Sequence, residues 1–200
     1  MDKRALILVD VQNDFLPGGA LAVPDGDAVI PVINRILPQF EHVFATQDWH
    51  PPHHVSFAST HKKRVHDVIW VQGMQQMLWP DHCVHDTAGA QLADALHKGA
   101  IEQIFHKGTA LDVDSYSAFF DNARKGSTGL ADHLKHLHIR DLYFAGLATD
   151  YCVLYSALDA LDLGFKVWVI RDACRAIGDA ESAFKKMAHH GAKILDSQSL

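Results

Sequence analysis

The stretch that indicates the fold is Ala5-Leu6-Ile7-Leu8-Val9-Asp10, an unbroken apolar run that ends in a carboxylate. Such runs are typical of parallel strands that are covered on both faces. Two later stretches repeat the arrangement: Ile104-Phe105-His106 is followed by Lys107, and Phe144–Tyr151 leads to Cys152. In an open parallel sheet, ligands bind outside the carboxyl ends of the strands, which share one edge. The sequence therefore predicts an α/β domain in which Asp10, Lys107 and Cys152 meet at that edge.

Strand and helix signals alternate along the chain, which favours βαβ units and a mostly parallel sheet. We expect strands at Ala5–Asp10, Val43–Gln47, Ile104–Lys107, Asp141–Ala145, Lys166–Arg171 and Lys193–Leu195. We expect helices at Asp27–Pro38, Ala90–Leu96, Leu130–Leu137, Asp150–Leu163 and Asp179–His189. Only the segment from Asp48 to Thr87, rich in Pro, His, Gly and Trp, resists this alternation, and a connection of that length is usually functional.

Composition excludes several classes of protein. Two hundred residues fit one domain. The net charge is −6, and no basic run is longer than Lys62-Lys63-Arg64, so the chain offers no basic surface for nucleic acid or anionic membranes. The apolar run before Asp10 is too short for a signal peptide, and no stretch is long enough to span a bilayer. Three widely spaced cysteines form no disulfide framework, so we expect a reducing cytoplasm, with Cys83 and Cys174 as packing residues. The sequence leaves the oligomeric state open, a homo-oligomer included.

The residues at the strand ends are the parts of a cysteine hydrolase. Cys152 should lie in the first turn of a helix capped by Thr149 or Asp150, where backbone amides and the helix dipole favour a thiolate and hold an oxyanion. Asp10 would take the thiol proton, and Lys107 would orient Asp10 or polarise the substrate carbonyl. The competing interpretation is structural: a buried cysteine, an aspartate that caps a turn and a solvated lysine.

Histidines are unusually numerous, and of the 15 in the chain seven crowd into one third of it: His50, His53, His54, His61, His66, His82 and His85. Asp48 and His50 stand at i and i+2, so in an extended segment their side chains share one face. With His82 they would form a two-His-one-carboxylate set suited to one Zn, Fe or Mn ion, and His54 is a candidate fourth ligand. The alternative is a solvated loop that happens to be rich in histidine.

Aromatic residues near these segments are candidates for the walls of a substrate pocket. Phe15 and Trp79 flank the proposed acid and metal segments and could sandwich a flat ring. Tyr116, in a serine-rich loop after Lys107, is a third candidate. Core packing is the competing interpretation for each.

Together these segments resemble the nicotinamidase branch of the isochorismatase-like cysteine hydrolases. The matching pieces occur in the family's order and are Asp10-Val11-Gln12-Asn13-Asp14-Phe15, Gln47-Asp48-Trp49-His50-Pro51, Trp79-Pro80-Asp81-His82-Cys83-Val84, His106-Lys107-Gly108 and Gly146-Leu147-Ala148-Thr149-Asp150-Tyr151-Cys152-Val153. The resemblance implies a single three-layer α/β/α Rossmann-like domain over residues 1–200. It implies a six-stranded, mainly parallel sheet and a long metal-site loop at about 48–87.

The resemblance also implies an activity, the hydrolysis of nicotinamide, and of pyrazinamide as well, to the acid and ammonia through a cysteine thioester. The implied roles are a triad of Asp10, Lys107 and Cys152, a divalent metal on Asp48, His50 and His82, and a further histidine of some members at His54. A cis peptide would precede Ala148, and the backbone amides of Ala148 and Cys152 would form the oxyanion hole. The positions that map onto the pocket are Phe15, Leu21 and Trp79.

Two residues depart from the family pattern: His53 stands where Asn is frequent, and Tyr151 stands where some members carry His. Two other functions are compatible with these residues. Another amidase or an isochorismatase-type vinyl-ether hydrolase would share the fold, although ether hydrolysis gives the three metal ligands no use. A non-catalytic, histidine-rich metal-binding protein would explain the histidines but not Lys107 or Cys152. A reactive Cys152 of low pKa would favour an enzyme.

Overall fold

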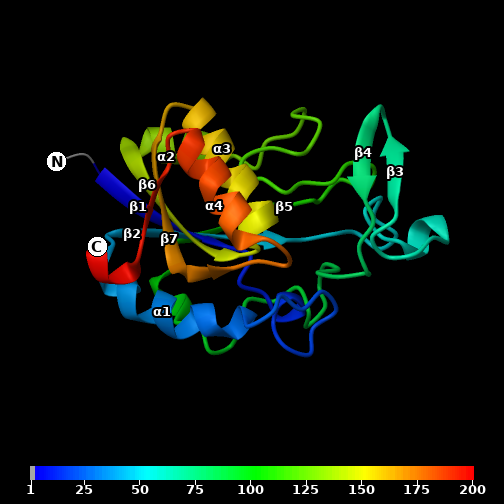
Figure 1. Ribbon diagram of the computed structural model, residues 1–200, viewed down its shortest axis with the longest axis horizontal. Helices are drawn as coiled ribbons and strands as arrows, with labels where there is room; N and C mark the ends of the chain where they lie inside the picture. The colour runs from blue at the N-terminus through cyan, green and yellow to red at the C-terminus, as the bar shows by residue number, and fades with distance from the viewer. Residues whose placement is uncertain (1–2) are drawn as a thin grey trace.

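A six-stranded parallel sheet organises the molecule, whose computed structural model describes residues 3–200 (Figure 1). The strands are β1 (Lys3–Val9), β2 (His42–Asp48), β5 (Gln103–Lys107), β6 (Ile139–Leu147), β7 (Lys166–Arg175) and β8 (Lys193–Leu195). Their order across the sheet is β5-β2-β1-β6-β7-β8, and every neighbouring pair is parallel. All six strands predicted from the sequence form, and the predicted parallel sheet is confirmed.

Helices cover both faces of this sheet, which confirms the three layers. They are α1 (Val29–Ile36), α2 (Leu130–His136), α3 (Leu154–Asp162) and α4 (Ala180–His189). Figure 1 shows α1 below the sheet and the other three helices above it. Among the residues that the structure describes, no helix combines the length and the apolar character that crossing a membrane requires.

Strand β1 shows why its sequence is apolar throughout. Leu6 and Leu8 pack in the cluster of α1, whereas Ala5, Ile7 and Val9 pack in the cluster of the other three helices. All five side chains are fully buried. A strand between two helical layers has no face exposed to water, so apolar and polar residues do not alternate along it.

The helix predicted at Ala90–Leu96 is wrong. This segment instead forms an antiparallel bridge between Leu92 and Gln12, in the loop after β1. The Ala93 amide donates to the Val11 carbonyl at 2.9 Å, so backbone groups that a helix would pair internally are paired with another segment. The apolar side chains that suggested a helix are buried all the same, because short apolar patterns fit either backbone.

The irregular segment after β2 contains a small hairpin, β3 (Val68–Val71) and β4 (Met74–Met77), paired antiparallel. Figure 1 shows the hairpin standing apart from the main sheet. No periodic pattern in the sequence predicts this hairpin, because four-residue strands are too short to establish one.

Candidate active site

Asp10, Lys107 and Cys152 come together at the carboxyl edge of the sheet. Asp10 follows β1, Lys107 is the last residue of β5, and Cys152 lies in the turn after β6. The Lys107 Nζ atom lies 2.9 Å from Asp10 Oδ2 and 3.4 Å from Cys152 Sγ. All three residues are buried. The edge predicted from the apolar runs therefore gathers the carboxylate, the amine and the thiol.

Local backbone and a neighbouring hydroxyl fix the direction of Asp10. Its φ of 49° lies in the left-handed region, which Asp tolerates better than most residues. Thr46 Oγ1, on the adjacent strand β2, donates to Asp10 Oδ1 at 2.6 Å inside the core. Sequence reasoning missed Thr46, whose only signal was its place two residues before Asp48 on the neighbouring strand.

Lys107 balances two buried carboxylates. Burial acts to lower its pKa, but Asp10 and Asp48 outweigh burial and raise the pKa well above its ordinary value. Burial acts to raise the pKa of Asp48, but Lys107 and His50 outweigh it and lower the pKa. For Asp10, burial outweighs the attraction of Lys107 and raises the pKa. Of the two carboxyls, Asp10 is therefore the better proton acceptor.

Cys152 lies in a π-helical turn, Thr149–Val153, that leads into α3. The Leu147–Ala148 peptide before the turn is cis, as the family resemblance implies. Burial raises the pKa of Cys152 well above its ordinary value, and the pull of Lys107 does not offset it. The resting thiol therefore needs a base before it can react.

The predicted cap of this turn is also wrong. Neither Thr149 nor Asp150 caps it with a side chain. The Asp150 carboxylate instead accepts hydrogen bonds from the amides of Ile177 at 3.0 Å and Gly178 at 2.7 Å. Asp150 thus ties the turn that bears the cysteine to the loop after β7.

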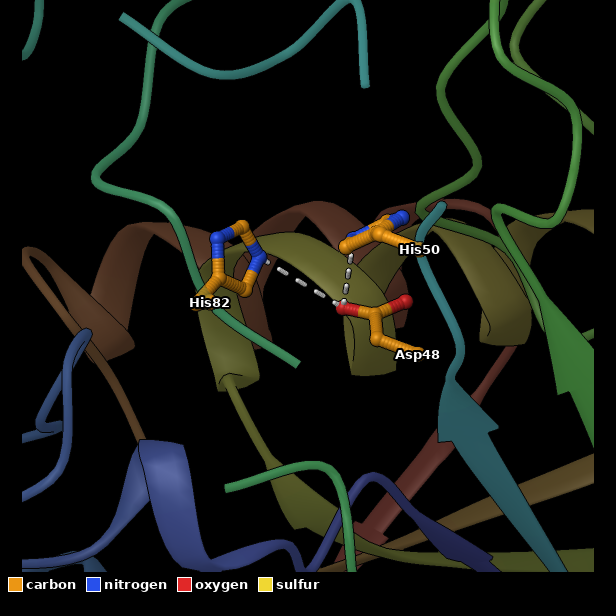
Figure 2. A group of neighbouring side chains, drawn as sticks. All are labelled: Asp48, His50 and His82. Carbon is orange, nitrogen blue, oxygen red and sulfur yellow. Dashed lines mark ion pairs between the residues drawn. The ribbon is translucent and has the colours of Figure 1, made fainter. Parts of the chain in front are cut away.

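Beside these residues, Asp48, His50 and His82 form a compact group (Figure 2). Asp48 ends β2, His50 follows it, and His82 comes from the long segment after β2. Asp48 Oδ2 lies 3.7 Å from His50 Nε2 and 3.9 Å from His82 Nε2. Figure 2 shows the two rings approaching this oxygen from different sides.

The hydrogen bonds of the two rings suit a divalent metal. His50 Nδ1 bonds to the carbonyl of Gly108 at 2.9 Å, and His82 Nδ1 bonds to the carbonyl of Pro80 at 2.8 Å. A carbonyl only accepts, so each Nδ1 carries a proton, and the neutral form of each ring would present the lone pair of Nε2 on the side of Asp48. Backbone carbonyls commonly orient metal-binding histidines in this way. One carboxylate and two imidazoles therefore fit a zinc-type site.

Gly108 makes room for His50. Its φ of +62° is a conformation that glycine adopts freely, and a Cβ there would lie 2.4 Å from His50 Cε1. Any side chain at this position would displace the ring.

His54 lies next to this group. Its ring stacks on His50 with centroids 4.2 Å apart. Its Nδ1 contacts Ser56 Oγ at 2.8 Å and its Nε2 contacts the Val113 carbonyl at 3.2 Å, so both nitrogens have protein partners. Burial lowers the pKa of His54 to about 4, and the neighbouring His50 acts in the same direction. In this arrangement His54 supports the ring of His50, and it adds no free nitrogen to the group formed by Asp48, His50 and His82.

A cavity opens onto Cys152 and onto two of the candidate metal ligands, Asp48 and His82. The four residues predicted to bind substrate, Phe15, Leu21, Trp79 and Tyr116, all line it. Trp79 Nε1 donates to the Tyr116 hydroxyl at 3.2 Å, which joins two of these walls.

Two further lining residues, Asp114 and Ile177, were missed. The buried Asp114 carboxylate accepts from Gln76 Nε2 at 2.9 Å and from the Ser115 amide at 2.8 Å. Its place in the loop after Lys107 was the available signal, whereas nothing in the sequence linked Ile177 to the site.

The isochorismatase domain model matches residues 4–199, almost the whole described chain. The chain belongs to the isochorismatase family. This family member is 50% identical to the nicotinamidase of Escherichia coli K12 over 202 residues, which cover 97% of this chain and 95% of that protein.

Two solved structures add to this similarity. A nicotinamidase/pyrazinamidase of Acinetobacter baumannii superposes with a TM-score of 0.96 at 42% identity, covering 100% of this chain and 98% of that one. A pyrazinamidase of Pyrococcus horikoshii in complex with zinc has a TM-score of 0.81 at 38% identity, covering 97% and 99%. The family member thus shares its fold over almost its whole length with a nicotinamidase/pyrazinamidase and with a pyrazinamidase.

Proposed function

We propose that the chain is a nicotinamidase, which hydrolyses nicotinamide to nicotinic acid and ammonia and accepts pyrazinamide as well. The observation that carries this proposal is the buried Asp10–Lys107–Cys152 cluster, which meets an aromatic cavity. The 50% identity to a nicotinamidase supports it. Cleavage of nicotinamide implies a role in NAD salvage.

The cavity suits a flat, neutral ring. Phe15 and Trp79 offer aromatic faces, and Leu21 and Tyr116 complete the apolar lining. The amide group of such a ring would then face Cys152.

In the first half of the reaction, Asp10 accepts the Cys152 proton and the sulfur attacks the carboxamide carbon. A carbon–sulfur bond forms, and the backbone amides of Ala148 and Cys152 hold the negative oxygen. The carbon–nitrogen bond then breaks as Asp10 returns the proton to the leaving group, so that ammonia departs and a thioester remains. Lys107 stays protonated and holds Asp10 in place.

In the second half, water hydrolyses the thioester. Asp10 takes a proton from the water, and the oxygen of the water attacks the thioester carbon. The carbon–sulfur bond then breaks. The proton returns to the sulfur of Cys152 and nicotinic acid is released. Covalent catalysis divides one difficult hydrolysis into two easier steps.

Asp48, His50 and His82 would hold one divalent ion, Zn, Fe or Mn. The Nδ1 hydrogen bonds of the two rings, which turn each Nε2 toward Asp48, support this assignment, and the zinc complex of the Pyrococcus horikoshii relative favours zinc. When bound, the ion supplies a Lewis acid that anchors the ring nitrogen of the substrate. We do not include His54 among the ligands, because both of its nitrogens have protein partners.

We infer a cytoplasmic location from the three unpaired cysteines. Nicotinamide is the partner that the site supports.

The decisive experiment measures ammonia and nicotinic acid released from nicotinamide by the metal-loaded protein and by Cys152→Ala. We expect rapid release by the wild type and a loss of several orders of magnitude in the variant, because the cysteine that lines the cavity beside Lys107 is Cys152 and the variant lacks its sulfur. Near-normal turnover by Cys152→Ala would sink the mechanism. No turnover by the wild type would move the proposal to another amidase of this fold.

The role of the metal in binding is tested by His82→Ala. Because His82 reaches the site without touching the triad, its loss should mainly raise KM for nicotinamide and leave kcat much less affected. Asp48→Ala is a poorer choice, since Asp48 also pairs with Lys107. A large fall in kcat at unchanged KM for His82→Ala would contradict a binding role.

A further inference from the structure

We propose that Gln12 is a positioning residue that fixes Asp48 for metal binding. The side chain is fully buried. Gln12 Nε2 donates to the Asp48 carbonyl at 2.8 Å, and Gln12 Oε1 accepts from the Asp48 amide at 2.9 Å. One side-chain amide thus pairs with both backbone groups of a single residue. The inference rests on the proposed metal site of Asp48, His50 and His82.

Gln12 lies beside the end of β2, on the side where no neighbouring strand pairs with it. The register of β1 with β2 ends at Leu8 and Ala45, so β1 gives no ladder partner to the last residues of β2 on that side. On the other side, Asp48 is in register with Lys107, whose carbonyl accepts from the Trp49 amide at 2.9 Å. The Gln12 amide pairs with Asp48 as a backbone peptide of a neighbouring strand would.

The Gln12 amide is itself held in one orientation. Its second N–H donates to the Ala90 carbonyl at 2.8 Å, so both N–H groups and the oxygen have partners. Ala90 belongs to the segment that bridges to the backbone of Gln12 through Leu92. A fully satisfied buried amide is rigid, and it transmits that rigidity to the residue it holds.

The orientation of Asp48 decides what its two oxygens reach. Asp48 Oδ1 contacts Lys107, and Oδ2 faces the Nε2 atoms of His50 and His82 (Figure 2). A rotation of the Asp48 peptide would swing the carboxylate out of this arrangement. Groups that orient metal ligands typically contribute about 10- to 100-fold to metal affinity.

Gln47 provides a matched control. It is also buried, and its Nε2 donates to the same Ala90 carbonyl at 2.8 Å. That hydrogen bond does not involve Asp48. Gln12→Met and Gln47→Met each replace a buried amide by an apolar chain of similar length, and they differ in whether the support of Asp48 is lost.

The test measures zinc affinity of metal-free protein by competition with a chromogenic chelator, with no use of activity. We expect Gln12→Met to weaken binding by about 10- to 100-fold, and Gln47→Met to bind close to the wild type. The cobalt-loaded form should show an altered visible spectrum in Gln12→Met alone, because the coordination geometry changes. A folded Gln12→Met that binds zinc like the wild type would overturn the proposal, as would equal losses in the two variants.

A second variant covers the case in which Gln12→Met does not fold. Gln12→Glu keeps an acceptor for the Asp48 amide and removes the donors to the two carbonyls, so it should also bind zinc more weakly, and wild-type affinity would overturn the proposal. If wild type and Gln47→Met bind no zinc, the metal site and the role of Gln12 both fall. Zinc binding without nicotinamide hydrolysis would instead refute only the activity.

Discussion

Lys107 carries most of the charge balance of the site. The buried amine lies between Asp10 and Asp48, and it also donates to the Ser115 carbonyl at 2.9 Å. Removing such a charge from water is costly, and the two carboxylates and the carbonyl compensate that cost. The lysine therefore holds the site together besides orienting Asp10.

Replacing this lysine should destabilise the protein as well as inactivate it. In Lys107→Met two buried carboxylates lose their common partner, so the free energy of unfolding of the metal-free protein should fall by about 3–5 kcal/mol. Urea denaturation measures this loss.

Lys98→Met is the control for that experiment. Lys98 pairs with the exposed Asp94 at 2.9 Å, and an exposed ion pair contributes little, so this variant should unfold like the wild type. Equal stability of Lys107→Met and the wild type would show that the ion cluster is not needed for folding.

At the scale of elements, the turns after the strands determine the pocket. The π-helical turn that carries Cys152 connects β6 to α3, and Asp150 in this turn binds the loop after β7. Ile177, in that loop, lines the same cavity as Cys152. One carboxylate thus sets the distance between the nucleophile and a pocket wall.

Asp150→Ala should loosen that wall. Hydrogen bonds to a charged group contribute about 1.5–3 kcal/mol each, so the loop with Ile177 would be held less firmly without them. A partial loss of its contacts with nicotinamide should raise KM by about tenfold. Steady-state kinetics measure this change, with the exposed Asp162→Ala as the control. An unchanged KM would show that the loop keeps its place without Asp150.

At the scale of the molecule, the proposed metal joins segments that are distant in the chain. Asp48 and His50 belong to the end of β2, whereas His82 belongs to the far end of the long segment that also contains the β3–β4 hairpin. A parallel bridge between His50 and Val84 already brings the two parts together. A bound ion would add a cross-link between them.

Removal of the metal should therefore lower Tm. A metal present at a hundredfold excess over Kd stabilises the native state by about 2.7 kcal/mol, so chelation should lower Tm by about 5–10 °C in a chain of this length. Differential scanning calorimetry with and without chelator measures the shift. His82→Ala should show a much smaller shift, and an equal shift in that variant would place the stabilising ion elsewhere.

The sequence by itself determined the fold class, the strands and the edge at which Asp10, Lys107 and Cys152 meet. It could do so because a strand covered on both faces must be apolar throughout, so a charged or reactive residue marks the end of the strand. The boundaries of the six strands differ from the predicted ones by only a few residues. The spacing of Asp48 and His50 likewise carried the metal hypothesis to residues that the structure brings together.

Only the tertiary structure decided what depends on contacts between distant segments. These contacts set the irregular path at 90–96, the support of Asp10 by Thr46 and the pairing of Gln12 with Asp48. They also raise the pKa of Cys152, because burial there outweighs the charge of Lys107. Local sequence specifies which residues end a strand, whereas burial and hydrogen-bond partners arise when the whole chain packs, which is why these features were beyond prediction.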